Sequence, residues 1–261
     1  MTVYRKDNLL IKKYDSRGEL GEDAAAEVSG AIRTLLDTKP GIRMIFAAAP
    51  SQNEFLEALA RDRSVDFSRI AAFHMDEYVG LPADAPQGFG NFLRERIFEK
   101  RPFKEVHYLN GLAAEIGEEC RRYTELLKKE PIDIVCLGIG ENGHIAFNDP
   151  GVADFHDCKT VKVVALDLVC RQQQVNDGCF AGIDEVPTHA LTLTVPVLFG
   201  CKQIFCVVPA KNKADAVYAS LNNSIGENCP ASILRNHGNA IMYLDAESGA
   251  RLAEIRGLTH V

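Results

Sequence analysis

The sequence has no apolar stretch long enough to cross a membrane and no recognisable secretory leader. Its apolar runs, such as residues 132–139, fall far short of the ~20 residues that a membrane helix needs. Residues 1–13 place Lys and Arg side chains around a short apolar core, Leu9 to Ile11, which is not a signal-peptide pattern. We therefore expect a cytoplasmic protein without a membrane partner.

Charge of either sign is also not concentrated along the chain. Lys and Arg number 29 and Asp and Glu number 36, which gives a formal net charge of −7. No run of five like charges occurs, so neither nucleic acid nor an anionic membrane surface is expected as a partner. A chain of this charge that binds a phosphorylated metabolite must concentrate positive potential at individual Lys and Arg residues.

Cysteine is plentiful, at eight residues, but no two of them form a C-x-x-C pair. Neither a metal-ligand spacing nor a disulfide framework is present. Cys136 and Cys206 lie within apolar runs, where thiols act as small buried hydrophobes. The sequence therefore predicts reduced cysteines and no metal site.

The chain does contain a regular alternation of short apolar runs with segments of helical period. Strands are expected at 42–48, 70–75, 106–109, 132–138, 161–166, 190–195, 204–208 and 240–244. Apolar residues at helical spacing mark 24–36, 55–60 and 116–127. This repetition predicts βαβ units, and hence an α/β fold with a mostly parallel sheet that helices cover on both faces.

No linker or internal repeat divides the chain, so one domain spanning 1–261 is expected. The interval 151–188 interrupts the alternation with the polar stretch 171–174 and two glycines. Such a segment is a candidate lid, with a surface excursion as the alternative.

In open α/β sheets ligands bind beyond the carboxyl ends of the strands, so the residues after each strand are the site candidates. Residues 138–143 read GIGENG, which matches the dinucleotide fingerprint G-x-G-x-x-G. Such a fingerprint opens a helix, whereas the residues that follow here run into Pro150-Gly151, a turn sequence. Gly140 and Gly143 are instead expected to turn the backbone and expose amides to an oxyanion or hydroxyl.

His144 follows in the same loop, two residues after Asn142 and five before Asp149. A histidine oriented by a carboxylate is the usual general acid-base arrangement near neutral pH. A histidine satisfied by a local hydrogen bond is the alternative. Metal binding by His144 and Asp149 would need a third ligand, and none lies at a familiar spacing. The pattern favours an acid-base histidine.

Two acids, Asp76 and Glu77, follow the strand expected at 70–75. Adjacent side chains of an extended chain point to opposite faces, so only one of the two should face a cleft. A carboxylate at this place suits removal of a proton next to a carbonyl, and a solvated strand end is the alternative.

Two further strand ends carry candidate anion-binding residues. Ser51 and Glu54 form S-x-x-E, which predicts a capping box at a helix start. The free amides of a helix start also bind phosphate, although Glu54 adds an unfavourable charge. Lys211 and Lys213 precede another helix, where one of them could neutralise an anion; a solvated lysine is the alternative.

Two segments together resemble the glucosamine-6-phosphate deaminase (isomerase) family. They are FHMDEYVGL at 73–81 and LGIGENGHIAFNDP at 137–150. The likeness spans nearly the whole chain. The related 6-phosphogluconolactonases share the fold and the Gly-His element, but their first motif reads Asp-Glu-Arg where this chain has MDEY.

The resemblance implies a Rossmann-like three-layer αβα sandwich that converts glucosamine 6-phosphate and water to fructose 6-phosphate and ammonia without a cofactor. By residue match, His144 would assist ring opening and Asp76 would take the C2 proton. Asp149, where Glu is usual, and Asn142, where an acid is usual, would serve the histidine. Lys213 would bind the phosphate.

The anion-binding positions depart from the family pattern. Residues 48–51, AAPS, stand where a Thr-Gly-Gly-Thr-like loop is usual, so Ser51 and Gln52 are expected to compensate for it. A phosphate-binding lid arginine falls near Gln174, and Arg171 is one helical turn away. The resemblance is therefore closer for the chemistry than for the identity of the sugar.

Other function classes stay open at this point. A lactonase would use His144 to activate water and would exchange no carbon-bound proton. A sugar-phosphate sensor could dispense with Asp76, and a related enzyme could act on a different amino sugar phosphate. A dinucleotide-dependent oxidoreductase would need a helix where Pro150 stands. The sequence also leaves open whether the chain is a monomer or a homo-oligomer.

Overall fold

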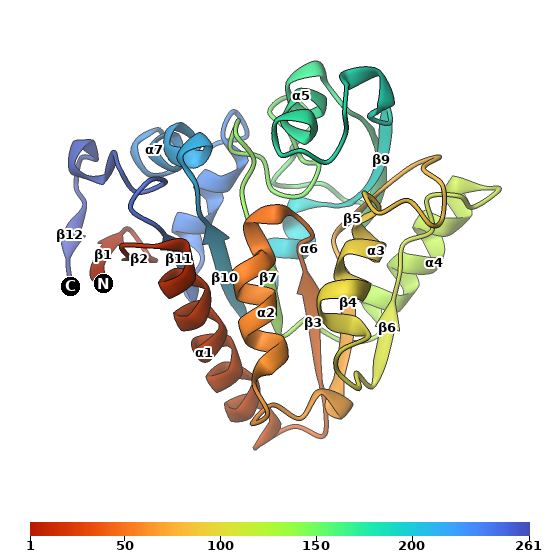
Figure 1. The fold of residues 1–261 in the computed structure, drawn as a ribbon, viewed down its shortest axis with the longest axis horizontal. Helices are drawn as coiled ribbons and strands as arrows, with labels where there is room; N and C mark the ends of the chain where they lie inside the picture. Colours follow the sequence, from red (N-terminus) through yellow and green to blue (C-terminus); the bar gives the residue numbers. More distant parts are fainter.

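A computed structural model describes all residues from 1 to 261. Its central sheet contains β1 (Thr2–Lys6), β2 (Leu9–Lys13), β3 (Ile42–Phe46), β4 (Ile70–His74), β6 (Glu105–His107), β7 (Ile134–Leu137), β10 (Gln203–Val208), β11 (Ala240–Leu244) and β12 (Thr259–His260). The order across this sheet is β12-β1-β2-β11-β10-β7-β3-β4-β6 (Figure 1). Across the sheet, the seven neighbouring strands that run from β2 at one end to β6 at the other all pair in parallel. Only β1 pairs antiparallel, with β2 and with β12. The predicted α/β fold with a mostly parallel sheet is confirmed.

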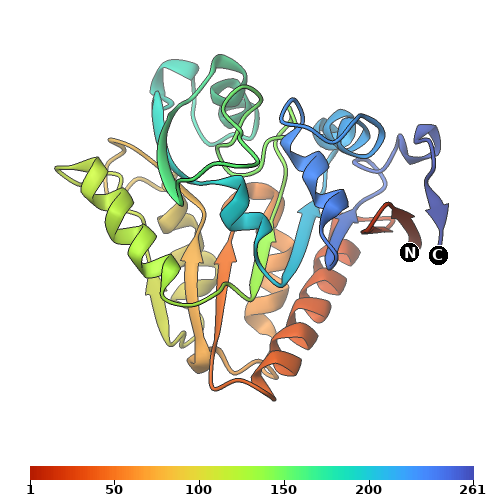
Figure 2. The ribbon, with the colours of Figure 1, turned by 180° about the vertical axis from the view of Figure 1, so that it is seen from behind.

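Helices cover both faces of this sheet. They are α1 (Arg17–Leu36), α2 (Asn53–Arg61), α3 (Phe89–Leu93), α4 (Ile116–Lys128), α5 (Leu168–Asn176), α6 (Val195–Phe199) and α7 (Ala214–Asn222). The first three pack on one face, whereas α4, α6 and α7 pack on the other, which Figure 2 shows from behind. None of the seven has the length and apolar character required to cross a bilayer.

The strands feed two separate cores because alternate side chains point to opposite faces. Met44 and Phe46 of β3 join the core beneath α1 and α2, whereas Ile45 between them joins the core beneath α4 and α6. Burial on both faces explains why these strands read as continuous apolar runs rather than as alternating patterns. The result is a three-layer sandwich.

Two of the expected strands lie outside the central sheet. β8 (Val161–Ala165) and β9 (His189–Leu193) pair antiparallel with each other, and β9 also pairs antiparallel with β5 (Asp76–Tyr78). This small sheet and α5 lie above the carboxyl ends of the parallel strands (Figure 1). The sequence predicts both strands but not this separate sheet, because an apolar run indicates a strand and not its partner.

The N-terminal hairpin formed by β1 and β2 was not predicted from the sequence. In β2 the buried residues Leu9 and Ile11 alternate with less buried ones. This strand pairs in parallel with β11, and through it β1 and β12 join the same sheet. The alternation covers only residues 9–11 before Lys12 and Lys13 follow, which is too short to predict a strand.

Candidate active site

A cavity opens at the carboxyl ends of β3, β4, β7 and β10, below α5. Its wall includes seven residues that the sequence singled out, which are Ser51, Gln52, Asp76, Gly140, His144, Gln174 and Lys213. It also includes Phe89, Gln173 and Asp177, which the sequence analysis did not name. The rule that ligands bind beyond the carboxyl ends of parallel strands therefore holds for this chain.

The glycine-rich loop after β7 forms no helix, since no helix or strand occurs between β7 and β8. The loop closes on itself instead, because Gly140 N donates to His144 O at 3.0 Å and Gly143 N donates to Gly140 O at 3.0 Å. A Cβ added at Gly140 would lie 2.2–2.4 Å from three ring atoms of His144. The imidazole therefore packs directly against the backbone of Gly140, and only glycine leaves room for it.

Replacing Gly140 with Ala is expected to lower turnover by about 10²-fold, because misplacing a reacting group by roughly 1 Å has an effect of that size. The matched control is Gly117→Ala on α4, where an added Cβ meets nothing within 4 Å. Gly140→Ala should lower the melting temperature somewhat, because the added Cβ overpacks the site, but both variants should fold. Equal activity of Gly140→Ala and Gly117→Ala would contradict the placement of His144.

His144 and Asp149 lie together, as the sequence predicts. His144 Nδ1 and Asp149 Oδ1 are 2.8 Å apart, although the ring N–H is not aligned with that oxygen as in a full hydrogen bond. Asn142 joins the two residues, since its Nδ2 donates to Asp149 Oδ1 at 2.8 Å and its Oδ1 accepts from His144 N at 3.0 Å. Asn142 does not line the cavity, so it can act only through its two neighbours.

The contacts of Asp149 with His144 and Asn142 favour its ionised form. Burial acts to raise the pKa of Asp149, but the contact with His144 and the hydrogen bond from Asn142 outweigh it, so the pKa is lowered. An acid at position 142 would offer no such donor when ionised and would repel Asp149. The carboxylate is therefore the negative partner that His144 faces.

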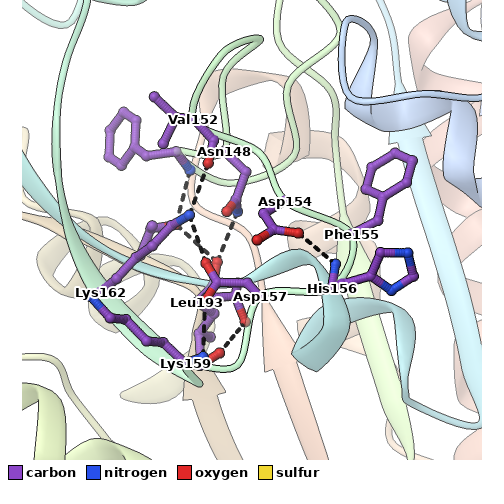
Figure 3. Close-up of polar contacts among 12 residues, drawn as sticks. Asn148, Val152, Asp154, Phe155, His156, Asp157, Lys159, Lys162 and Leu193 are labelled. Atoms are coloured by element: carbon purple, nitrogen blue, oxygen red, sulfur yellow. Dashed lines mark hydrogen bonds and ion pairs between the residues drawn. The ribbon is translucent and has the colours of Figure 1, made fainter.

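The chain on both sides of Asp149 is fixed by polar contacts (Figure 3). Asn148 Nδ2 donates to the carbonyls of Ile145 and Leu193 at 2.9 and 2.8 Å. Lys162 Nζ donates to Val152 O and to an Asp157 carboxyl oxygen, both at 2.9 Å. These contacts tie the loop to β8 and β9 and hold Asp149 in place.

A third potential metal ligand lies beside the histidine and the carboxylate. Cys170 on α5 brings its sulfur to the pair, and the ligand atoms of His144, Asp149 and Cys170 all lie within 4.8 Å of one another. This third ligand was not apparent from the sequence, because α5 approaches the loop only in the folded chain. Burial raises the pKa of the Cys170 thiol, and the nearby Asp149 charge raises it further.

Asp76 faces the cavity from the start of β5, and only 8% of its surface is exposed. Burial raises its pKa well above the usual value, and the charge of Glu77 adds to the shift. His74 supports this position, since its Nδ1 donates to Asp76 O at 2.8 Å and its Nε2 accepts from Leu109 N at 2.9 Å. Burial lowers the pKa of His74 to about 4, so this histidine is neutral and structural.

Glu77 points the other way, as predicted for adjacent acids on an extended chain. Its carboxylate accepts from the backbone N–H groups of Tyr78, Phe89 and Gly90 at 2.9–3.1 Å. It therefore anchors the start of α3 and takes no part in the cavity wall.

The predicted capping box is wrong. The helix α2 begins at Asn53, and its N-cap Gln52 makes no side-chain cap. Glu54 instead forms an ion pair with Arg17, with NH2 and Oε2 2.9 Å apart. The preceding turn Pro50–Gln52 starts the helix one residue later than a Ser51 cap requires, so Ser51 is free to line the cavity.

Gln52 is also placed differently from the expectation that it would donate to an anion. Its Nε2 donates to Val207 O at 3.0 Å and to Ser51 Oγ at 3.1 Å. Both amide hydrogens are thus used within the protein, and Gln52 fixes the loop against β10.

Lys213 is the cation inside the cavity. It is 4% exposed and makes no hydrogen bond or ion pair through Nζ, whereas Lys211 is exposed. Burial lowers the pKa of Lys213, and the charges of Asp177 and Glu141 oppose that shift. A buried ammonium without a partner is costly unless a ligand supplies the opposite charge.

Two other predicted binding residues lie outside the cavity wall. Arg171 directs its NH2 to the carbonyls of Ile183 and Val186 at 2.6 and 2.9 Å, so it holds the turn after α5 and contacts no site residue. Gly143 has a φ of +82°, and a Cβ there would lie 2.6 Å from Cys229 Sγ. Glycine is required at this turn for backbone geometry and packing.

Comparison with known proteins shows the family to which the chain belongs. Residues 15–243 match the family model described as glucosamine-6-phosphate isomerases/6-phosphogluconolactonase. A glucosamine-6-phosphate deaminase of Listeria monocytogenes is 36% identical over 215 residues, which cover 82% of this chain and 90% of that protein. One from Bacillus cereus is 33% identical over 241 residues, covering 92% and 87%.

Solved structures give the same family. A monomeric glucosamine-6-phosphate deaminase superposes with a TM-score of 0.84 at 31% identity, over 92% of this chain and 98% of the other. The 6-phosphogluconolactonase of Thermotoga maritima shares the fold, with a TM-score of 0.74 at 19% identity over 91% and 99% of the two chains. The chain therefore belongs to the glucosamine-6-phosphate isomerase/6-phosphogluconolactonase family.

Proposed function

We propose that this chain is an enzyme that isomerises and deaminates glucosamine 6-phosphate, giving fructose 6-phosphate and ammonia. The observation that carries the proposal is one cavity shared by a buried carboxylate, Asp76, and a histidine faced by a second carboxylate, His144 with Asp149. The two relatives and the solved structure described above that are more than 30% identical over most of their length are named as glucosamine-6-phosphate deaminases, which supports the same choice.

Ring opening is the step for His144. Asp149 beside Nδ1 favours the tautomer that carries its proton there and leaves Nε2 as the base. Nε2 would take the proton of the C1 hydroxyl and return it to the ring oxygen, which converts the pyranose to the open aldehyde. Asn142 would keep Asp149 next to the imidazole, because it bonds both to the Asp149 carboxylate and to the backbone N–H of His144.

Proton transfer between carbons is the step for Asp76. The amino group and the aldehyde acidify the C2 proton, and a buried carboxylate with a raised pKa is a stronger base than a solvated one. Removal of that proton by Asp76, with protonation of the aldehyde oxygen from solvent, gives an enolamine. Protonation of the enolamine at C1 then gives a C2 imine. Water then adds to the imine, ammonia leaves, and the C2 ketone is formed.

The phosphate would bind at the end of the cavity formed by Lys213 and Ser51, since the N–H groups of Gln52 and Asn53 already donate to carbonyls of the preceding turn. Lys213 supplies the positive charge, and Ser51 supplies a hydroxyl that no helix cap uses. We further propose that the segment 151–188 acts as a lid on one functional unit, 1–261, because its helix α5 contributes Gln173 and Gln174 to the wall.

Replacing Lys213 with Ala is expected to weaken binding of glucosamine 6-phosphate by about tenfold or more. A hydrogen bond to a charged group contributes a binding free energy that corresponds to a change of this size. Turnover of unphosphorylated glucosamine should change little. The control is Lys211→Ala, which removes an exposed lysine two residues away. Equal losses for both sugars in Lys213→Ala would show that this lysine does not bind a phosphate.

The function is tested by incubating the pure protein with several hexosamine 6-phosphates and, separately, with 6-phosphogluconolactone. Ammonia release from glucosamine 6-phosphate, with lactone hydrolysis no faster than without enzyme, is the expected result. Rapid lactone hydrolysis without ammonia release from any amino sugar would favour the other branch of the family. Ammonia from a different hexosamine 6-phosphate would keep the chemistry and change the substrate.

A further inference from the structure

Next to the catalytic cavity lies a second hollow whose wall contains an arginine. The two share Ala48, Ala49, Phe89, Gln174 and Asp177 in their walls, and the second adds Phe92 and Arg96. Arg96 lies on the π-helical turn Arg94–Phe98, which continues α3. Arg96 and Lys213 therefore line adjacent hollows that share the wall formed by Ala48, Ala49 and Gln174.

The guanidinium of Arg96 is held in place but its outer edge is free. Nε donates to Asn53 Oδ1 at 2.6 Å, and the guanidinium carbon lies 3.7 Å from the centre of the Phe92 ring. Neither terminal nitrogen donates a hydrogen bond. The one carboxylate within 4 Å is that of Glu95, 3.7 Å from NH1 and 66% exposed, a pairing that contributes little. Two parallel N–H groups on a fixed guanidinium match the oxygens of a phosphate.

The other arginines nearby are already committed to the fold. Arg171 donates to the carbonyls of Ile183 and Val186. Arg17 forms two hydrogen bonds with Glu54 and one with Pro50 O. Arg96 alone combines a place in the wall with unused donors. Its anchor Asn53 is the first residue of α2 and adjoins the Ser51–Gln52 turn.

A second cation is also needed on charge grounds. Asp177 lies in the wall shared by both hollows, and Asp76 lies in the catalytic cavity. A phosphate dianion near these carboxylates requires more than the single charge of Lys213. Gln174, at the place where the sequence resemblance implies an arginine, supplies none.

We propose that Arg96 binds the substrate phosphate and takes the part of the guanidinium that is missing at position 174. This inference rests on the proposed function, because it names a further contact with the same sugar phosphate. The phosphate would lie between Lys213 and Arg96, near Ser51, with Gln174 as a neutral neighbour.

The test uses inorganic phosphate as a competitive probe together with two substrates, glucosamine 6-phosphate and glucosamine. Arg96→Gln is expected to raise the inhibition constant of phosphate and the KM of the phosphorylated sugar by about tenfold or more. It should leave kcat/KM for glucosamine within about twofold, and Arg96→Lys should restore part of the loss because one charge returns. The matched control is Arg94→Gln on the same turn, which removes an arginine outside both hollows.

The variants separate failure of this inference from failure of the function. If Lys213→Ala weakens phosphate inhibition and Arg96→Gln leaves it within twofold of wild type, the role of Arg96 is refuted and the phosphate site stands. An equal loss with both sugars in Arg96→Gln would assign the residue a structural role and refute the proposal as well. If neither variant changes phosphate inhibition, the phosphate site itself is wrong, and the proposal falls with it.

Discussion

Replacing Asp76 with Asn is expected to lower turnover by about 10²–10⁴-fold, the range typical of a lost general base. Asn keeps the shape of the side chain but has no basic lone pair to accept the C2 proton. The measurement is the initial rate of ammonia release, together with solvent deuterium incorporated at the carbon that was C1 or C2. Activity of the Asn variant within threefold of wild type would refute the role of Asp76.

The same substitution should not destabilise the fold. The pKa of Asp76 is raised in the folded state. Ionisation of Asp76 therefore lowers the free energy of unfolding, in full at a pH above the pKa of the folded state and not at all at a pH below the pKa of the unfolded state. A neutral Asn removes this cost at neutral pH, and the melting temperature should stay the same or rise.

The neighbouring carboxylate provides the matched control. Glu77→Gln replaces one of the two carboxylate oxygens that accept backbone N–H groups with an NH2 donor, so an acceptor is lost and the melting temperature should fall. Hydrogen exchange at the substrate carbon should persist. The two adjacent acids are thus expected to give opposite results, one in catalysis and one in stability.

Removing His144, Asp149 or both is expected to give three variants with similarly low activity. Each single change to Ala should cost about 10²–10⁴-fold in turnover. The double variant should lose far less than the product of the two, because residues that act as one unit are not additive. The physical reason is the 2.8 Å contact between Nδ1 and Oδ1, which leaves Asp149 no function once the imidazole is gone.

Asn142→Ala extends this comparison. It removes the donor to Asp149 and the acceptor of His144 N but leaves both reacting groups in place. A loss smaller than that of His144→Ala is expected. Strictly multiplicative effects of His144→Ala and Asp149→Ala would show that the two residues work independently.

The sequence predicted the site best where strand ends set the geometry. Asp76, His144 and Lys213 each follow a strand of the parallel sheet or lie one short turn beyond it. Because those carboxyl ends meet at one edge, residues distant in the chain could be assigned to one site. The alternation rule likewise separated Asp76 from Glu77.

The parts that the sequence did not predict depend on how α5 and the small sheet lie over that edge. Gln173 and Asp177 reach the cavity from α5 and its C-cap, whereas Cys170 of the same helix reaches the histidine–carboxylate pair. No local spacing in the sequence sets where that helix packs. Arg171 sits one turn from Gln174 yet bonds to carbonyls on the far side of the helix. The capping box failed for a related reason, since the distant Arg17 takes the carboxylate of Glu54.

The most direct test of the account is to follow glucosamine 6-phosphate in deuterated water by NMR while ammonia is measured in the same sample. For the wild type, we predict one ammonia released per ketose phosphate formed, with deuterium bound at the carbon that was C1 or C2 of the substrate. Asp76→Asn should abolish both signals. Ammonia release without carbon-bound deuterium would mean that the proton never exchanges with solvent, and no ammonia from this sugar at all would contradict the central claim.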